Sequence, residues 1–289
     1  MRVSRKRDIA PYVFLAPAFL IFALFSYFPF LKTILMSATI TNSGGEMKKF
    51  VGFRNYLDLF TSAEFVSTLA VTGKFMAMVF VPTLVFGMIM ALLTERRNGP
   101  VSVLSEVLFS LPMAVASASA AIVWRMVFNP ASGVLNYILG TNINWLADKN
   151  WALFSVAMVT VWLQVGFTFI FLVTALRGVQ PEVKESAMID GANAWNIFWK
   201  IKLPLISPTL FFVVFFNMTL SFQSFGQIRL LTQGGPGTST TVLVYQLYQE
   251  AFMNKRYGSS AAMSVVLFLI MLAVTLFQIR LERKGVFYN

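Results

Sequence analysis

Few residues of this chain could carry chemistry. Its 289 residues include no histidine and no cysteine, and aspartate and glutamate together number 12. The commonest general base, the thiolate nucleophile and the usual zinc ligands are therefore missing. From this composition we expect no catalytic residue, no cofactor and no metal site.

One polar segment, residues 178–204, carries an ordered set of structural signals. Pro181 suits the first turn of a helix, and Glu185 suits the positive end of the helix dipole. Gly191 fits the left-handed position just after a helix end. The segment therefore predicts a helix of about three turns, a break, and a second short helix that ends at Pro204.

The second short helix is predicted to be amphipathic. Trp195, Phe198, Trp199 and Lys202 share one stripe at helical spacing. Such a helix could lie in a membrane interface, or it could form a docking knob for another protein. Spacing alone leaves both interpretations open.

The same segment resembles the EAA signature of permeases of binding-protein-dependent ABC importers. In that signature a glycine follows the glutamate by six residues, and Ile-x-Leu-Pro begins about ten residues later. The matching residues here are Glu185, Ser186, Ala187, Asp190, Gly191, Ile201, Leu203 and Pro204. Ser186 departs from the usual alanine, but it is also small. Segments 50–56, 128–130 and 231–236 resemble the carbohydrate-uptake branch of this family.

The resemblance implies a fold, a function and partners. The fold would be the type I ABC importer permease fold with six transmembrane helices. The function would be uptake of a sugar, an oligosaccharide or glycerol-3-phosphate by alternating access. The implied partners are a cytoplasmic ATP-binding subunit dimer, a second related permease subunit in a heterodimer, and an extracytoplasmic solute-binding protein.

The resemblance also assigns roles within the segment. It implies a coupling helix in a groove of the ATPase subunit, with Glu185 facing basic residues and with Ala187 and Gly191 keeping the knob narrow. The expected ATPase-coupling residues are Glu185, Ser186, Ala187, Asp190, Gly191 and Pro204.

The elements that must position this segment are apolar helices. Hydrophobic residues make up 57% of the chain, charged residues 12%, and the mean hydropathy is +0.71. Soluble domains are about half apolar and a quarter charged. We therefore expect an all-α polytopic membrane protein in contact with lipid, built as one domain over residues 1–289. Six stretches are long enough to span: 12–38, 70–94, 103–128, 151–177, 205–231 and 259–280.

Basic residues indicate the orientation. The net charge of +11 does not indicate nucleic acid, because the cations lie at the ends of apolar stretches. Arg2, Arg5, Lys6 and Arg7 precede an apolar run that is longer than a signal-peptide core, so we expect an uncleaved first span. The excess of Lys and Arg in alternate loops predicts that both termini lie in the cytoplasm. The resemblance implies that the membrane is the bacterial cytoplasmic membrane.

Polar side chains inside the predicted spans are candidates for a substrate path. They lie on one face of each of two helices and are Asn217, Gln164, Ser221, Ser224 and Thr168. Amides and hydroxyls beside aromatic rings suit a sugar. Interhelical hydrogen bonds are the alternative explanation. Glu106, near one end of a span, is expected to pair with a cation or to reach water.

Rival functions fit the sequence less well. The chain has no G-x-x-x-x-G-K-[ST] motif, so ATP hydrolysis would require another subunit. An ion-coupled secondary transporter of a small polar solute stays an alternative, although the central spans lack carboxylates and no inverted repeat is visible. An intramembrane enzyme would need a nucleophile–base pair, and none is found in mid-span. The sequence does not identify the substrate.

Overall fold

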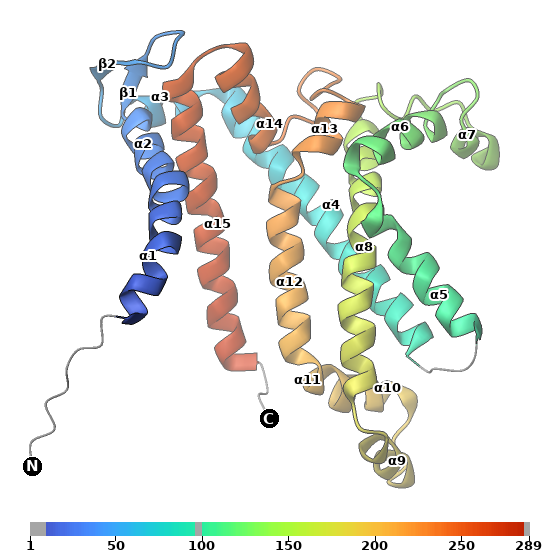
Figure 1. Ribbon diagram of the computed structural model, residues 1–289. Coiled ribbons are helices and arrows are strands. Elements are labelled where there is room, and N and C mark those ends of the chain that lie inside the picture. The colour runs from blue at the N-terminus through green and yellow to red at the C-terminus, as the bar shows by residue number, and fades with distance from the viewer. Residues whose placement is uncertain (1–9, 96–99, 286–289) are drawn as a thin grey trace, which may run out of the picture. The chain divides into compact units, whose positions relative to one another are not determined.

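The computed structural model describes residues 10–95 and 100–285 of a chain that is mostly helical (Figure 1). The chain divides into two compact units. The first contains the chain up to Ser62 together with Leu247–Phe268, and the second contains Ala63–Gln246 together with the chain from Leu269 onward. The cations at residues 2–7 and at Arg96 and Arg97, which contribute to the predicted orientation, lie outside the described residues.

The first unit begins with a long apolar helix. It consists of α1 (Ala10–Phe22), a π-helical turn (Ala23–Tyr27) and α2 (Phe28–Ser37). The Phe28 N–H closes this turn by donating to the Ala23 carbonyl. Pro29 follows directly in the sequence. The apolar window of this helix is not buried within the described chain, as expected of a helix whose surface contacts lipid.

A β-hairpin follows, which the sequence analysis did not predict. Strand β1 (Thr39–Thr41) pairs antiparallel with β2 (Met47–Phe50), and α3 (Arg54–Thr61) comes next. The Asn55 Nδ2 of α3 donates to the Ser37 carbonyl at 2.8 Å and to the Thr39 carbonyl at 3.0 Å. These bonds hold the predicted aromatic segment 50–56 against the end of the first span.

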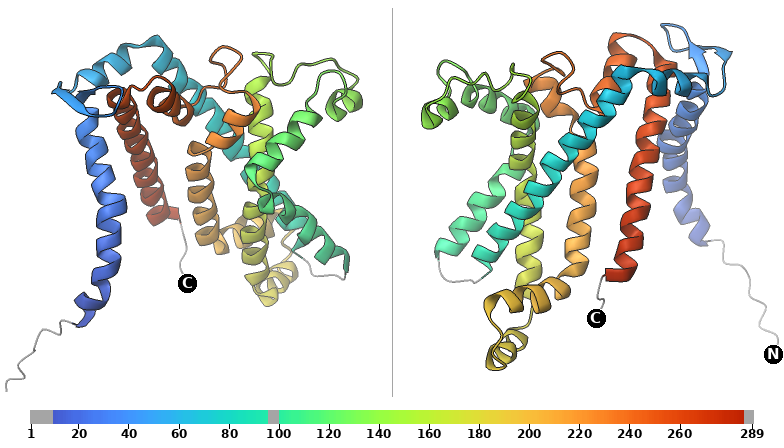
Figure 2. Two further views of the ribbon diagram at one scale, coloured as in Figure 1. Left: turned by 45° about the horizontal axis from the view of Figure 1, so that its top comes forward. Right: turned by 180° about the vertical axis from the view of Figure 1, so that it is seen from behind.

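Three helices form the packed centre of the second unit: α4 (Ala63–Thr94), α8 (Ala152–Gly178) and α12 (Ser207–Phe222) (Figure 2). Their buried apolar cluster comprises Ala91, Phe169, Leu172, Val173, Leu176, Val179, Ile206 and Val213. A Cβ added at Gly87 of α4 would lie 2.4 Å from the Thr168 Cγ2 of α8. Glycine therefore lets these two helix backbones approach closely.

The predicted third span is not one straight helix. Helix α5 (Pro100–Ser110) passes through a 3₁₀ turn (Leu111–Ala114), and α6 (Ser117–Val127) then leaves at a bend of 103°. Val115 and Ala116 have extended backbones at the bend. Pro112 in the 3₁₀ turn lacks a backbone N–H, which favours interruption of the helix there.

The predicted fifth span is also interrupted. A 74° bend at Ile206 separates α12 from the helical stretch Ala194–Leu205, and α12 stops at Phe222 before α13 (Phe225–Leu231). Within the described residues the continuous apolar helices long enough to span are Tyr12–Ser37, Ala63–Thr94, Ala152–Gly178 and Tyr257–Arg283. If each bent pair counts as one span, the total is six, and the prediction of six spans is confirmed.

Shorter elements join these helices. Helix α7 (Val134–Leu139) lies between α6 and α8, and it ends at Gly140 in the left-handed conformation. Helix α14 (Leu243–Tyr248) leads through a π-helical turn (Gln249–Met253) into α15 (Tyr257–Gly285), which carries the last apolar span. A Cβ at Gly258 would lie 2.3 Å from the Thr39 carbonyl oxygen, so glycine is required where α15 begins.

Candidate functional site: the segment between α8 and α12

The first half of this segment is the helix that the sequence predicted. Helix α9 spans Pro181–Ile189, with Pro181 in its first turn. Gly191 has φ +82°, and the N–H groups of Gly191 and Ala192 donate to the carbonyls of Met188 and Ala187. Those two bonds form a Schellman motif that satisfies the last carbonyls of the helix. The predicted start, length and glycine break are confirmed.

The second half differs from the prediction at Pro204. Helix α10 (Ala194–Ile197) continues through a π-helical turn (Phe198–Lys202) into α11 (Leu203–Leu205), so the helix passes Pro204 and ends at the Ile206 bend. Proline in a regular α-helix clashes with the carbonyl four residues earlier. The π turn, closed by the Leu203 N–H donating to the Phe198 carbonyl, widens the helix directly before Pro204. The prediction that the helix stops there was wrong.

Helix α9 is largely exposed. It extends beyond the adjoining ends of α8 and α12 in the ribbon (Figure 1), and none of its nine residues is buried by the described part of the chain. Met188 is 53% and Ile189 87% exposed. Glu185, Ser186, Asp190 and Gly191 are exposed as well, and Ala187 is half-buried. Exposed apolar side chains outside the spans are typical of a docking surface.

The predicted stripe of the second helix divides into two parts. Trp195 and Trp199 are 68% and 48% exposed, with their rings 5.5 Å apart. Phe198 packs edge-on against Trp199 at 5.2 Å. Lys202 instead turns inward and forms an ion pair with Glu95 at the end of α4. The stripe therefore does not present one uniform surface.

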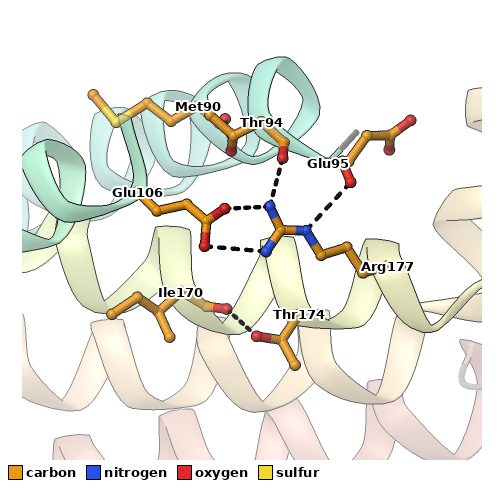
Figure 3. Close-up of polar contacts among 7 residues, drawn as sticks. All are labelled: Met90, Thr94, Glu95, Glu106, Ile170, Thr174 and Arg177. Carbon is orange, nitrogen blue, oxygen red and sulfur yellow. Dashed lines mark hydrogen bonds and ion pairs between the residues drawn. The ribbon is translucent and has the colours of Figure 1, made fainter. Parts of the chain in front are cut away.

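Arg177, in the last turn of α8, lies at the centre of a polar node (Figure 3). Its Nη1 and Nη2 donate to the Glu106 carboxylate of α5 at 3.1 and 2.5 Å. Its Nη2 also donates to the Thr94 carbonyl at 2.7 Å, and its Nε to the Glu95 carbonyl at 3.2 Å. The guanidinium group of Arg177 thus binds the Glu106 carboxylate and, at the same time, caps the C-terminal carbonyls of α4.

The node confirms one prediction and adds residues that the sequence analysis did not single out. Glu106 pairs with a cation, as expected. Arg177 and Glu95 carry no assigned role in the sequence analysis, and Lys202 was predicted only as a member of the amphipathic stripe. Their partners lie 71 to 107 residues away in the sequence, so no local pattern signals these contacts.

The candidate substrate-path residues lie in the interior of the second unit. Asn217 of α12 is fully buried, and its Nδ2 donates to the Thr168 Oγ1 of α8 at 2.8 Å and to the Val213 carbonyl at 2.9 Å. The hydroxyls of Ser221 and Ser224 donate to carbonyls of α12 one turn earlier. Among the described residues, neither the Asn217 Oδ1 nor the Gln164 Oε1 has a hydrogen-bond partner.

A bundle of apolar spans, with an exposed helix between two of them, indicates a multi-pass membrane protein. Residues 83–285 match the family model described as "Binding-protein-dependent transport system inner membrane component". The chain belongs to this family. It is therefore a multi-pass inner-membrane permease, and the predicted family is confirmed.

Curated relatives support the same assignment along the whole chain. The chain is 34% identical over 285 residues to the sn-glycerol-3-phosphate transport system permease protein UgpA of Agrobacterium fabrum, covering 97% of each chain. It is 34% identical over 283 residues to the protein of the same name from Escherichia coli O157:H7, covering 96% of each. These names confirm the predicted carbohydrate-uptake branch.

Solved structures confirm the predicted fold. The chain superposes with a TM-score of 0.84 and 23% identity on a subunit of a bacterial alginate ABC transporter, covering 96% of each chain. That transporter was crystallised in complex with an alginate pentasaccharide-bound periplasmic protein. A chain of the MetNI methionine ABC transporter superposes at a TM-score of 0.55 over 78% of this chain.

Proposed function

We propose that this permease imports a carbohydrate or a related polyol phosphate, driven by ATP hydrolysis in a separate cytoplasmic subunit dimer. A second, related permease chain completes the passage, and an extracytoplasmic solute-binding protein delivers the substrate. The observation that carries the proposal is α9, a capped helix at the EAA-like residues in which no residue is buried by the described chain. A secondary transporter has no need of such a helix.

Helix α9 is proposed to occupy a groove of the ATPase subunit. Glu185 is exposed and available to basic residues of that subunit. Ala187 and Ser186 are small, so the knob is narrow, and Gly191 sets the angle of the chain that leaves it. Asp190 and Pro204 complete the proposed coupling residues.

The mechanism is conformational. ATP binding closes the ATPase dimer and moves the docked helices, and a rigid α9 passes this motion to the spans. Coupling requires that α9 make different contacts in the two states of the transporter, because a partner shifts an equilibrium only by its differential affinity. The permease itself breaks no bond in this scheme.

The proposed substrate class is supported by the relatives, which are named as permeases for sn-glycerol-3-phosphate, and by the alginate transporter with the same fold. The proposed path runs along Gln164, Thr168, Asn217, Ser221 and Ser224. The two buried amide oxygens that lack partners among the described residues could accept hydrogen bonds from substrate hydroxyls. Since Asn217 is fully buried, this requires α8 and α12 to separate in another state.

The proposed orientation places α9 and both termini in the cytoplasm. Three observations support it: the cations in the same predicted loops, the need of α9 to reach a cytoplasmic ATPase, and the even number of spans when each bent pair counts as one.

The test is purification of the permease from its native host membrane in mild detergent. A nucleotide-hydrolysing subunit should copurify with the parent chain and be lost from Glu185→Lys, because the new cation would face basic residues. Asp58→Lys on α3 is the matched control, because it reverses a charge outside residues 178–204. The ATPase subunit should still copurify with this variant. The proposal would be refuted if no ATPase subunit copurified with the parent chain, or if Glu185→Lys copurified with as much ATPase subunit as the parent.

Uptake energetics provide a second readout. Vanadate should stop uptake, and a protonophore should leave it intact while ATP is maintained. The opposite pattern would favour the ion-coupled alternative.

A further inference from the structure

The segment that carries α9 is tied at both ends to the same end of α4. Before α9, Arg177 donates to the backbone carbonyls of Thr94 and Glu95 at 2.7 and 3.2 Å. After α9, Lys202 forms an ion pair with the Glu95 carboxylate. The chain between residues 177 and 202 is therefore a loop whose base is closed on one helix terminus.

The same node reaches α5. Arg177 binds both oxygens of the Glu106 carboxylate through its planar fork. A bidentate pair fixes direction as well as distance. The carbonyls at the end of α4 would otherwise lack helical partners, and a cation there is favoured by the helix dipole. Arg177 of α8 thus joins α5 and the end of α4 (Figure 3). Lys202, from the second helix of the segment, reaches the same end of α4 through Glu95.

The charged side chains of this node are partly buried. Those of Glu95 and Lys202 are 12% and 14% exposed, and those of Arg177 and Glu106 are 16% and 32% exposed. Buried pairs are weakly screened by salt, and loss of one partner leaves the other charge stranded. The node therefore resists rearrangement more than a surface ion pair would.

Apolar packing does not by itself fix the direction of α9. Val179 and Ile206 anchor the two ends of the segment in the buried cluster. Between them lies a cavity of about 350 Å³, which the start of α9 lines with Gln180 and Val183, opposite Leu205 at the end of α11. This half-open cavity separates the start of α9 from α11, so the polar contacts at the base add direct ties between the segment and the end of α4.

We propose that Arg177, Lys202, Glu95 and Glu106 form a base clamp, which makes the coupling segment, the end of α4 and α5 move as one body. Arg177 is a positioning residue in this scheme, since it contacts neither substrate nor nucleotide. The inference rests on the proposed function, because the clamp transmits a motion only if an ATPase subunit pulls on α9.

The test uses the complete transporter with two spin labels in this chain. The chain has no native cysteine, so Leu93→Cys at the end of α4 and Ala194→Cys after α9 give a defined pair. Both sites are exposed. The distance between the labels is measured without nucleotide and after trapping with ATP and vanadate, and it should be the same in both states of the parent.

In variants that weaken the clamp, the distance between the labels should no longer be the same in the two states. Lys202→Met and Arg177→Lys should broaden the distance distribution and shift it between the two states. ATP hydrolysed per sn-glycerol-3-phosphate imported should rise roughly 2- to 30-fold in the same variants. Lys202→Arg keeps the ion pair and should behave as the parent. Thr174→Val is the matched control, because the Thr174 hydroxyl donates only within its own helix, to the Ile170 carbonyl.

Two results would overturn the clamp. One is a label distance that changes on trapping in the parent. The other is a Lys202→Met chain that cannot be distinguished from Lys202→Arg in both distance and coupling. Loss of the ATPase subunit from the parent itself would instead remove the proposed function, and the clamp with it. The second of these results, obtained with normal ATPase association, removes the clamp alone and leaves the proposed function in place.

Discussion

The centre of the second unit and the α9 segment are built on opposite principles. At the centre, Thr168 and Asn217 are fully buried and bonded to each other across α8 and α12, and Gly87 brings α4 against them. In α9 no residue is buried by the described chain. The comparison indicates that the stabilising contacts of the permease are concentrated in the centre, whereas α9 offers a surface that the described chain leaves uncovered.

Substitutions should therefore divide by region. A change at the centre should lower the free energy of unfolding and leave association with the ATPase intact. A change on α9 should leave folding intact and weaken association with the ATPase.

The largest effect is expected at Gly87. Gly87→Ala places a methyl group 2.4 Å from the Thr168 Cγ2, so α4 and α8 must move apart. Overpacking of this kind costs about 1–3 kcal/mol. Gly73→Ala is the matched control in the same helix, since nothing lies within 4 Å of its added Cβ. Thermal unfolding in detergent should show a lower Tm for Gly87→Ala alone, and equal Tm values would contradict the packing account.

A smaller effect is expected at Asn217. Asn217→Leu loses the hydrogen bonds to Thr168 and to the Val213 carbonyl, and such bonds inside membranes are worth about 0.6–2 kcal/mol. Adding Thr168→Val to Asn217→Leu should lower the free energy of unfolding only slightly further, because both substitutions remove the same hydrogen bond. Denaturation of the two single variants and the double variant measures this coupling.

The same substitution tests the proposed substrate path. If Asn217 and Gln164 contact the substrate, their leucine variants should change uptake kinetics while ATPase association stays normal. Unchanged uptake by chains that fold normally would remove both residues from the path and leave Asn217 with a packing role.

The sequence predicted features that depend on neighbouring residues. The start of α9 at Pro181 and its end at Gly191 follow from local backbone rules, and both were found. The EAA-like spacing is equally local. The base clamp could not be predicted, because Arg177 and Glu106 come together only when α5 and α8 pack.

Hydropathy located the spans but not their bends. Residues 103–128 are apolar enough to span, so hydropathy alone does not reveal the 103° break at Val115 and Ala116, although Pro112 lies just before it. At Pro204 the sequence predicted a helix end that the structure does not have, because the helix continues to Leu205. A helix breaker is tolerated there because the preceding turn widens to a π-helix.

The central claim is that α9 docks in a cytoplasmic ATPase subunit, and a crosslink at Ile189 tests it most directly. Ile189 is 87% exposed, so Ile189→Cys should change stability by less than about 0.5 kcal/mol. A photoreactive group attached to this cysteine in native membranes should capture a nucleotide-hydrolysing subunit, with less capture after Glu185→Lys. Capture of lipid alone, or of a protein that binds no nucleotide, would contradict the account.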